Sequence, residues 1–301
     1  MSQIVAASPH VTTKNSTAVI MRDVLIALLP AVIAGCVVFG LRALLVVAVT
    51  TAACVFFEWG FEKLCHKPST ISDLSAAVTG VLLAMNLPVS IPLWQAVFGA
   101  LVAIVAVKGL FGGIGKNFAN PAITARIVMF LAFSKTMTAW VFPDAVSSAT
   151  PLAMMANGES VDYLTLLLGN HGGCLGETSA LALLIGFAYL LIRGVISWHT
   201  PVCFVGTVFV MSLILGQDAV GQILSGGLML GAIFMATDYS TTPSTNLGRV
   251  LFGIGAGLLT VLIRFYGAYA EGVSFAILFM NILTPYLSKW TETKPFGGVA
   301  A

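Results

Sequence analysis

The stretch "LSAAVTGVLLAMNLPVSIPLWQAVFGALVAIVAVK" (residues 74–108) carries no charged side chain before its last residue, Lys108. An apolar helix of about 17 to 25 residues crosses a bilayer, so this stretch is long enough for two crossings. Its centre, "NLPVSIP" (86–92), holds two prolines and an asparagine, which favour a turn. The stretch therefore predicts a tight helical hairpin inside a membrane.

The composition of the whole chain supports the same class. Of 301 residues, 58% are hydrophobic and only 9% are charged, against about 25% charged residues in soluble domains. So few charges cannot cover the surface of a water-soluble fold. Transmembrane barrels alternate polar and apolar residues and are far more polar. We therefore expect an all-α polytopic membrane protein.

The number of crossings follows from uncharged stretches bounded by charges or by Gly and Pro, which predict about ten transmembrane helices. They lie near residues 24–41, 43–58, 74–89, 91–108, 120–135, 178–193, 200–217, 219–237, 249–264 and 272–289. We expect a single membrane domain over residues 1–301. Residues 1–22 are polar and the apolar run from Val24 can span, so it is expected to be a retained first helix.

Two segments resemble each other within the chain. "GGIGKNFANPAITAR" (112–126) and "MATDYSTTPSTNLGR" (235–249) each follow a Gly-rich span and place an arginine five or six residues after a proline. Paired breaks of this kind mark ligand or ion sites in transporters built from two repeats. They predict two repeat-like halves with broken helices, parallel or inverted. Two ordinary polar hairpins are the alternative.

The distribution of basic residues predicts the orientation. An even number of spans puts both termini on one side. Eleven of the fourteen Lys and Arg residues then lie on that side, and the exceptions are Arg42, Lys135 and Arg264. Positive charge accumulates in the cytoplasm. We therefore expect both termini and the segment 1–22 in the cytoplasm, and residues 136–177 as an outer loop.

The outer loop contains an unusual polar sequence, "PDAVSSATPL" (143–152). Hydroxyl side chains in loops usually cap helices or bond to their own backbone. Here, however, Asp144, Ser147, Ser148, Ala149 and Thr150 fit the pattern D-x-x-(S/T)-G-A-T, with Ser148 in the place of Gly. A proline follows the threonine, which favours an extended, displayed conformation.

This pattern resembles the site at which a flavin transferase attaches FMN to a threonine in the D subunit of Rnf complexes. The related B subunit of the sodium-pumping NADH:quinone reductase shares it. Four further segments resemble the Rnf protein in the same order: "SPHVTTKNSTAVIMRDVLIALLPA" (8–31), "FGGIGKNFANPAITAR" (111–126), "LLLGNHGGCLGETSALALLIGFAYLL" (166–191) and "FMATDYSTTPSTNLGR" (234–249). The resemblance extends from residue 8 to about residue 290.

The resemblance implies a subunit of a complex in the bacterial inner membrane that moves electrons between ferredoxin and NAD and couples this to Na⁺ or H⁺ movement. It implies FMN joined to Thr150 through a phosphoester, with Ser148 as the second candidate hydroxyl. Asp144 is a candidate contact for the transferase. The expected partners are an outer-side flavoprotein subunit, iron–sulfur subunits and that transferase, and no nucleic acid.

Three further residues are candidate site residues. His171, in "GNHGGCLGETS" (169–179), is a candidate flavin contact or pH sensor, with a satisfied turn residue as the alternative. Arg126 and Asp238 lie in the two broken segments, and are candidates for a second, non-covalent flavin site near the cytoplasmic side or for an ion path. Other charges at that edge are Glu58, Glu62, Asp73 and Arg249, which snorkelling to water would also explain.

Two other functions remain open at this stage. A passive solute channel or transporter would also use a broken-helix repeat fold, and a scaffold subunit would need no flavin. The acceptor pattern separates the redox function from the channel. The chain lacks cysteine clusters for iron–sulfur centres and a G-x-G-x-x-G signature for NAD, so those tasks are expected of partners.

Overall fold

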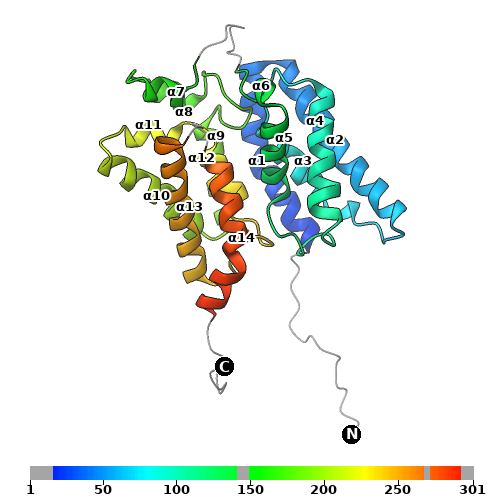
Figure 1. Ribbon diagram of the computed structural model, residues 1–301. Helices are drawn as coiled ribbons and strands as arrows, with labels where there is room; N and C mark the ends of the chain where they lie inside the picture. Colours follow the sequence, from blue (N-terminus) through cyan, green and yellow to red (C-terminus); the bar gives the residue numbers. More distant parts are fainter. Residues whose placement is uncertain (1–15, 141–148, 268–271, 293–301) are drawn as a thin grey trace, which may run out of the picture.

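The computed structural model describes residues 16–140, 149–267 and 272–292. This part of the chain is helical and contains no strand. An isolated bridge joins Pro88 to Cys174. The helices form two groups that lie side by side, one from the first half of the chain and one from the second (Figure 1). The prediction of an all-α membrane fold is confirmed.

The first group runs from α1 to α5. Its elements are α1 (Thr17–Phe39), α2 (Leu41–Leu64), the 3₁₀ turn η1 (Ile71–Asp73), α3 (Ser75–Met85), α4 (Leu93–Leu101), the π-helical segment η2 (Val102–Gly109) and α5 (Pro121–Ala132). The hairpin predicted between 74 and 108 is present. Its first arm ends at Met85 and its second begins at Leu93.

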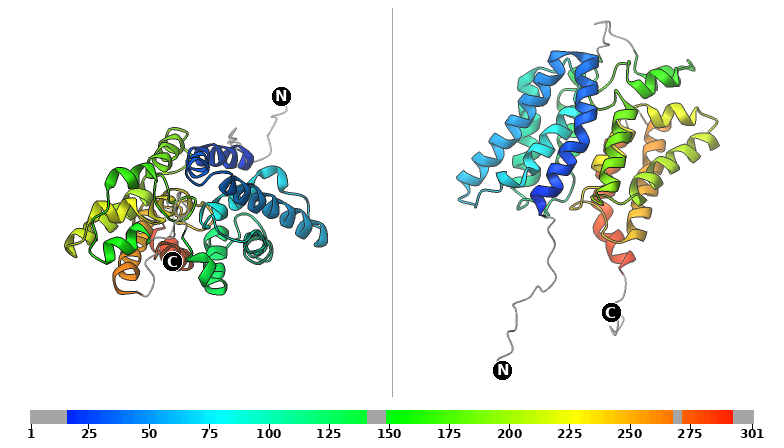
Figure 2. Two further views of the ribbon diagram at one scale, coloured as in Figure 1. Left: turned by 90° about the horizontal axis from the view of Figure 1, so that it is seen from above. Right: turned by 180° about the vertical axis from the view of Figure 1, so that it is seen from behind.

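The second group runs from α9 to α14. Its elements are α9 (Ala180–Ile192), α10 (His199–Ile214), α11 (Ala219–Leu224), α12 (Leu228–Leu230), the π-helical segment η3 (Gly231–Met235), α13 (Asn246–Tyr266) and α14 (Val273–Thr291). Along the sequence, three short helices separate the two groups. They are α6 (Ser134–Met137), α7 (Pro151–Ala156) and α8 (Tyr163–Leu168). They lie at the end opposite to the start of α1 and the end of α14 (Figures 1 and 2).

Not all of the helices are long enough for a full membrane crossing. Among the described residues, three helices are long and apolar enough to cross a membrane, namely α1, α2 and α13. Five shorter apolar stretches follow, including the 11 residues of α3 and the 12 of α5. A crossing needs about 20 helical residues, so α3 and α5 each reach only part of the way. The predicted broken helices are present in both halves.

Three boundaries depart from the sequence prediction. Helix α1 begins at Thr17, because Ser16 caps it by accepting a bond from Val19 N, so residues 17–22 are helical rather than part of a polar tail. The expected span 219–237 is divided into α11, α12 and η3 by the turn at Ser225–Gly227. The expected outer loop 136–177 contains α7 and α8.

The two similar segments have similar local structures. Each follows a π-helical segment, η2 in the first half and η3 in the second. Each ends at a capped helix. Asn120 accepts bonds from Ala122 N and Ile123 N, and Thr245 accepts one from Gly248 N. π-helical turns are rare and often occur at functional sites. The structural echo therefore favours the repeat-like interpretation over two unrelated hairpins.

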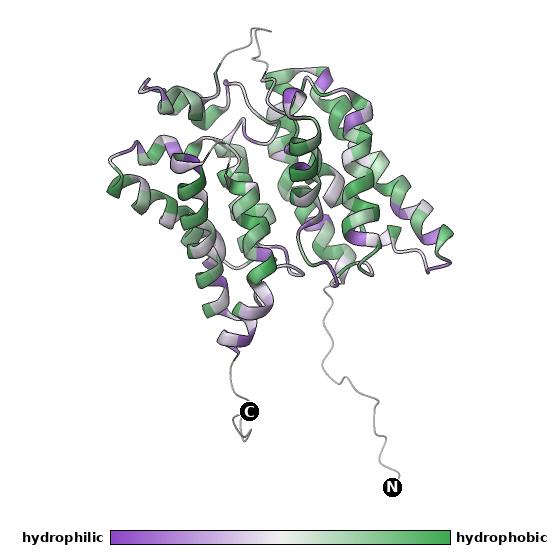
Figure 3. Cartoon of the chain, viewed as in Figure 1, coloured by the Kyte–Doolittle hydropathy of each residue, from purple (hydrophilic) through white to green (hydrophobic). Residues whose placement is uncertain are grey.

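The helices are built largely of hydrophobic residues between the two ends of the molecule (Figure 3). Large side chains such as Leu29, Val37, Phe56 and Ile192 are exposed there. Between helices the contacts are close. A Cβ on Gly186 of α9 would lie 2.3 Å from the carbonyl oxygen of Ala27 in α1. Small residues that let backbones approach are how helices associate in lipid, because lipid supplies no hydrophobic drive between them.

Candidate functional site

Thr150 lies at the amino end of α7. Its backbone is extended, with φ −66° and ψ 156°, as the following proline requires. Its Oγ1 accepts a bond from Ala153 N at 3.3 Å and so caps the helix. The residue is half-buried rather than fully displayed, while Ala149 is exposed. Asp144, Ser147 and Ser148 lie outside the described residues.

Helix α7 is anchored on the break in the second half. Leu152 is buried, and a Cβ on Gly226 would lie 2.7 Å from its Cδ1. Gly226 has φ +66°, so it also needs the left-handed conformation that glycine tolerates. On the other side of this turn, Arg264 donates to the carbonyl oxygen of Ser225 at 3.2 Å. Thr150 is therefore two residues from a fixed contact with the helix break.

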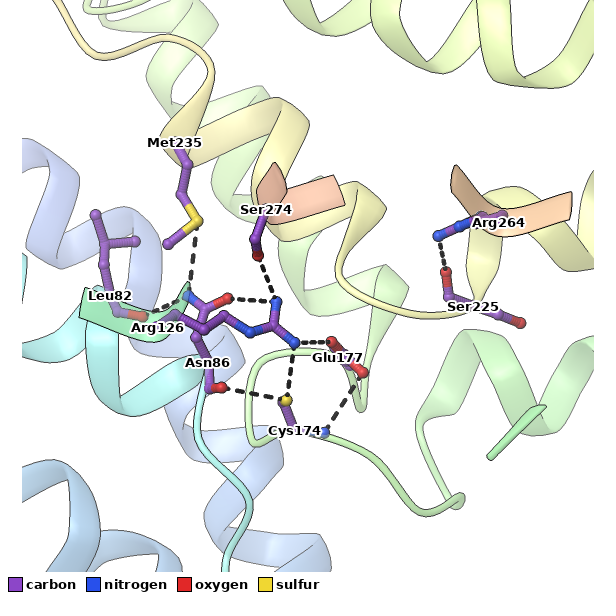
Figure 4. Close-up of polar contacts among 9 residues, drawn as sticks. All are labelled: Leu82, Asn86, Arg126, Cys174, Glu177, Ser225, Met235, Arg264 and Ser274. Atoms are coloured by element: carbon purple, nitrogen blue, oxygen red, sulfur yellow. Dashed lines mark hydrogen bonds and ion pairs between the residues drawn. The ribbon is translucent and has the colours of Figure 1, made fainter. Parts of the chain in front are cut away.

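A buried ionic cluster lies between the two halves (Figure 4). We call it the Arg126 cluster. Arg126 Nη1 donates to Asn86 Oδ1 at 3.1 Å and to Ser274 Oγ at 2.9 Å. Its Nη2 lies 3.5 Å from Glu177 Oε1 and 3.5 Å from Cys174 Sγ. Arg126 and Glu177 are each only 5% exposed. Arg126 is therefore a buried charge whose partners come from both halves of the chain.

Glu177 reaches this cluster because the loop before α9 folds inward. Leu175 N and Gly176 N bond to the carbonyl oxygens of Leu87 and Met85, where α3 ends. A Cβ on Gly176 would lie 2.9 Å from Met85 O, so the approach requires glycine. Gly176 thus serves contact with α3, and α9 is capped by Ser179 rather than by Glu177.

The second break also touches the Arg126 cluster. A Cβ on Gly227 would lie 3.1 Å from Glu177 Oε1 and 3.3 Å from Arg126 Nη1. Gly226 contacts Leu152 of α7 in the same turn. One pair of glycines therefore separates the helix that carries Thr150 from the ionic cluster in the interior.

His171 lies in the inward-folded loop and is 4% exposed. Its Nδ1 is 3.2 Å from Gly172 O, and its Nε2 is buried without a hydrogen-bond partner in the described part of the chain. Burial lowers the pKa of the imidazole, which the Gly172 carbonyl and Glu177 partly oppose. His171 is thus a buried, half-satisfied residue. Whether it meets a flavin stays a prediction.

Asp238 lies apart from Arg126, in the segment before α13. It accepts bonds from Ser240 and Thr241 at 3.1 Å. Desolvation raises the pKa of its carboxyl, and these bonds oppose the shift. Asp238 lines a pocket between the two halves, together with Asn120, Lys108 and Thr79, and Arg126 is not part of its lining. The cavity of about 100 Å³ is smaller than the roughly 300–1,000 Å³ typical of organic ligand sites.

Three asparagines that sequence reasoning missed join the two halves. Asn86 links α3 to Arg126, and its Nδ2 lies 3.6 Å from Met235 Sδ. Asn120 N donates to Asn281 Oδ1 at 3.1 Å, and Asn281 Nδ2 donates to Thr241 O at 3.0 Å. Asn86 and Asn281 stand in otherwise apolar runs. Polar residues in such runs usually bond across helices, and that was the available signal.

Comparison with known proteins finds relatives over nearly the whole chain. The NQR2, RnfD, RnfE family matches the chain over residues 4–297. The D subunit of a Na(+)-translocating ferredoxin:NAD(+) oxidoreductase complex from Acetobacterium woodii is 46% identical, over 97% of this chain and 95% of that protein. The D subunit of a proton-translocating ferredoxin:NAD(+) oxidoreductase complex from Clostridium ljungdahlii is 39% identical, over 97% and 96%.

A third relative, the D subunit of an ion-translocating oxidoreductase complex from Halorhodospira halophila, is 34% identical, over 99% of this chain and 96% of its own length. The relatives therefore match from end to end and not only in one motif. The chain belongs to the NQR2, RnfD, RnfE family.

Proposed function

We propose that this chain is the D subunit of an ion-translocating ferredoxin:NAD oxidoreductase complex and carries electrons through FMN joined to Thr150. The family and the names of its relatives support the complex. The observation that carries the flavin is the position of Thr150, extended and half-buried at the tip of a short helix, within the acceptor pattern.

The geometry of Thr150 suits a phosphoester. The capping bond from Ala153 uses Oγ1 as an acceptor and leaves its O–H bond to be replaced. A threonine hydroxyl is a weak nucleophile, so a separate transferase must activate it. Helix α7, which Thr150 caps, lies at the end of the molecule away from the start of α1 (Figure 1), where an external enzyme would have access. FMN would supply one-electron redox chemistry, and the chain would position it.

In this proposal, α7 holds the flavin attachment point in a fixed position. Leu152 and Met155 pack on the second break, at Gly226 and Gly221. These contacts would fix the attachment point relative to the interior, so that the flavin is presented to neighbouring subunits from a defined place. In this proposal the chain lies in the bacterial inner membrane. The excess of Lys and Arg on the side of the termini supports placing Thr150 on the side away from the cytoplasm.

A passive solute channel is supported less well. A channel of two broken-helix halves needs an open route between them. Here the Arg126 cluster joins the halves with a guanidinium and a carboxylate that are both 5% exposed. A second flavin, bound without a covalent link in the pocket beside Asp238, would require the two halves to move apart, because the cavity is small.

Mass analysis tests the flavin. The chain is co-expressed with a flavin transferase as wild type, Thr150→Ala and Thr165→Ala, the last as a matched control because Thr165, in α8, is half-buried like Thr150. We expect an FMN adduct on the wild-type peptide that contains Thr150, its loss in Thr150→Ala and its retention in Thr165→Ala. An adduct that persists in Thr150→Ala, or none on the wild type, would contradict the proposal.

A further inference from the structure

A second group of buried charges lies where α2 ends and α3 begins. We call it the Glu58 cluster. Glu58 and Glu62 project from the same face of α2, one turn apart, and are 5% and 7% exposed. Lys108 of η2 is 4% exposed, bonds to Glu58, and donates to Ser75 Oγ at 2.5 Å. Asp73 accepts from that Ser75 hydroxyl and is half-buried.

Two carboxylate oxygens in this cluster have no partner among the residues that the structure describes. They are Glu58 Oε2 and Glu62 Oε2, and both are buried. The other oxygen of each side chain is satisfied, in Glu58 by Lys108 and in Glu62 by Thr70, whose backbone N donates at 2.9 Å and whose hydroxyl donates as well. A buried polar atom without a partner is rare and indicates an unrecorded water, ion or ligand.

The two unpartnered oxygens belong to residues that line one pocket. Its cavity of about 340 Å³ is bordered by Glu58, Glu62, Thr70, Asp73 and Lys108. A water molecule occupies about 30 Å³ of liquid, so the space holds a cation with part of its hydration shell. The polar atoms that these five residues bring are carboxylate and hydroxyl oxygens and one ammonium.

The charges in the cluster do not balance. Two buried carboxylates face one buried ammonium, and the half-buried Asp73 adds a further negative charge. Lys67 also lines the pocket, but its side chain is exposed and its ammonium lies 5.2 Å from the centre of the Phe61 ring. Carboxylates at positions i and i+4 of a helix repel each other. An additional positive charge, either a proton on one carboxyl group or a bound cation, would relieve the repulsion between Glu58 and Glu62.

We propose that this pocket binds a small, hard monovalent cation, Na⁺, through the free oxygens of Glu58 and Glu62. Carboxylate and hydroxyl oxygens suit hard cations, while soft metals prefer sulfur or imidazole. A single positive charge offsets the excess of the two buried carboxylates over Lys108. The inference does not rest on the proposed flavin, because no residue of the pocket lies near α7.

The location of the pocket also gives the bound cation a route. Lys108 and Ile114 line both this pocket and the cavity between the halves that Asp238 borders. Lys108 thus stands between the two spaces, tied to Glu58 on one side. A cation that moves from Glu62 to the space between the two halves would pass beside Lys108 and Ile114, which line both spaces.

Equilibrium dialysis of the purified full-length chain with ²²Na⁺ tests the site. Ionic strength is held with choline chloride at a pH of about 8, well above the ordinary pKa of a carboxyl group. We expect saturable binding of one Na⁺ per chain, weakened at least about tenfold by Glu62→Gln through loss of a charged ligand. Glu159→Gln is the matched control, because Glu159 is exposed near α7. It should bind Na⁺ like the wild type.

Three results would overturn the proposal. They are no saturable binding to the wild type, unchanged binding in Glu62→Gln, and equal weakening in Glu159→Gln. Should Glu62→Gln fold poorly, Glu62→Asp withdraws the carboxylate by one methylene and is expected to weaken binding in a folded protein. Thr150→Ala must bind Na⁺ normally, so a failure of the flavin assignment and a failure of the cation site give different results.

Discussion

The Arg126 cluster and the Glu58 cluster are both buried and ionic, yet they are built differently. In the first, one guanidinium meets one carboxylate, and neutral partners from α3 and α14 supply further bonds. In the second, two buried carboxylates share one ammonium, and two oxygens are left free beside a cavity among the described residues. A complete set of charges holds the halves together, whereas an incomplete set next to a cavity is suited to binding.

Removal of Arg126 should have the largest effect on stability. Arg126→Met leaves Glu177 buried without its cation, which costs about 3–5 kcal/mol. Unfolding in mixed detergent micelles, followed by circular dichroism, measures this loss. The double variant Arg126→Met with Glu177→Gln should recover much of it, because no unpaired charge remains. A loss below about 1 kcal/mol in the single variant, the size of a surface pair, would contradict the closed cluster.

Removal of Lys108 should cost less, and Na⁺ should reduce the loss. Lys108→Met leaves Glu58 and Glu62 without a buried cation, but the adjacent pocket lets water and Na⁺ reach them. We expect about 2 kcal/mol of destabilisation, smaller in NaCl than in choline chloride at equal ionic strength. Arg126→Met should show no such difference between the two salts. An equal response of both variants to Na⁺ would remove the distinction between the clusters.

Two glycines test the comparison, because they differ in the free space that a Cβ atom would find in each cluster. A Cβ on Gly227 meets Glu177 and Arg126 at 3.1 and 3.3 Å, whereas a Cβ on Gly60, between Glu58 and Glu62 on α2, meets nothing within 4 Å. Gly227→Ala should destabilise by about 1–2 kcal/mol through overpacking. Gly60→Ala should be neutral or stabilise by up to about 1 kcal/mol, because alanine favours a helix. Thermal unfolding of both variants checks the difference, and the reverse order would refute it.

The smallest effect concerns His171, in the loop that delivers Glu177 to the Arg126 cluster. Its pKa is lowered from 6.5 in the folded chain. The unfolded state therefore takes up the proton first as pH falls. The stability that neutral His171 contributes is complete above pH 6.5 and is lost as pH drops through the lower folded-state pKa. His171→Gln should flatten the decline of the melting temperature between neutral and acid pH. An unchanged slope would show that other groups cause the decline.

Much of the fold was predictable from the sequence because membrane helices are defined by runs without charge. The expected span 120–135 appears as Pro121–Ala132 and the expected span 249–264 as Asn246–Tyr266. The break in 219–237 was missed, because its glycines and serine are compatible with an apolar helix. The turn is explained by packing against a distant part of the fold, because Gly227 lies directly against the Arg126 cluster.

The candidate site was predictable only in part. Thr150 is recognised by a local pattern, and the structure reproduces its extended backbone. Arg126 was a candidate, but its partner Asn86 is 40 positions away and Ser274 is 148 positions away. Glu58 and Glu62 were expected to snorkel to water, whereas the packing of α2 against η2 and α3 buries both. Charge pairing over such separations leaves no signal in a single sequence.

The most direct measurement of the central proposal is electron transfer in the assembled complex. Inverted membrane vesicles that contain the complex with wild-type chain or with Thr150→Ala are supplied with reduced ferredoxin, and NAD reduction and ion uptake are followed together. We predict that Thr150→Ala assembles normally but loses both activities, because its electron carrier is missing. Full NAD reduction by an assembled complex without FMN on this chain would contradict the account and leave the chain as a scaffold.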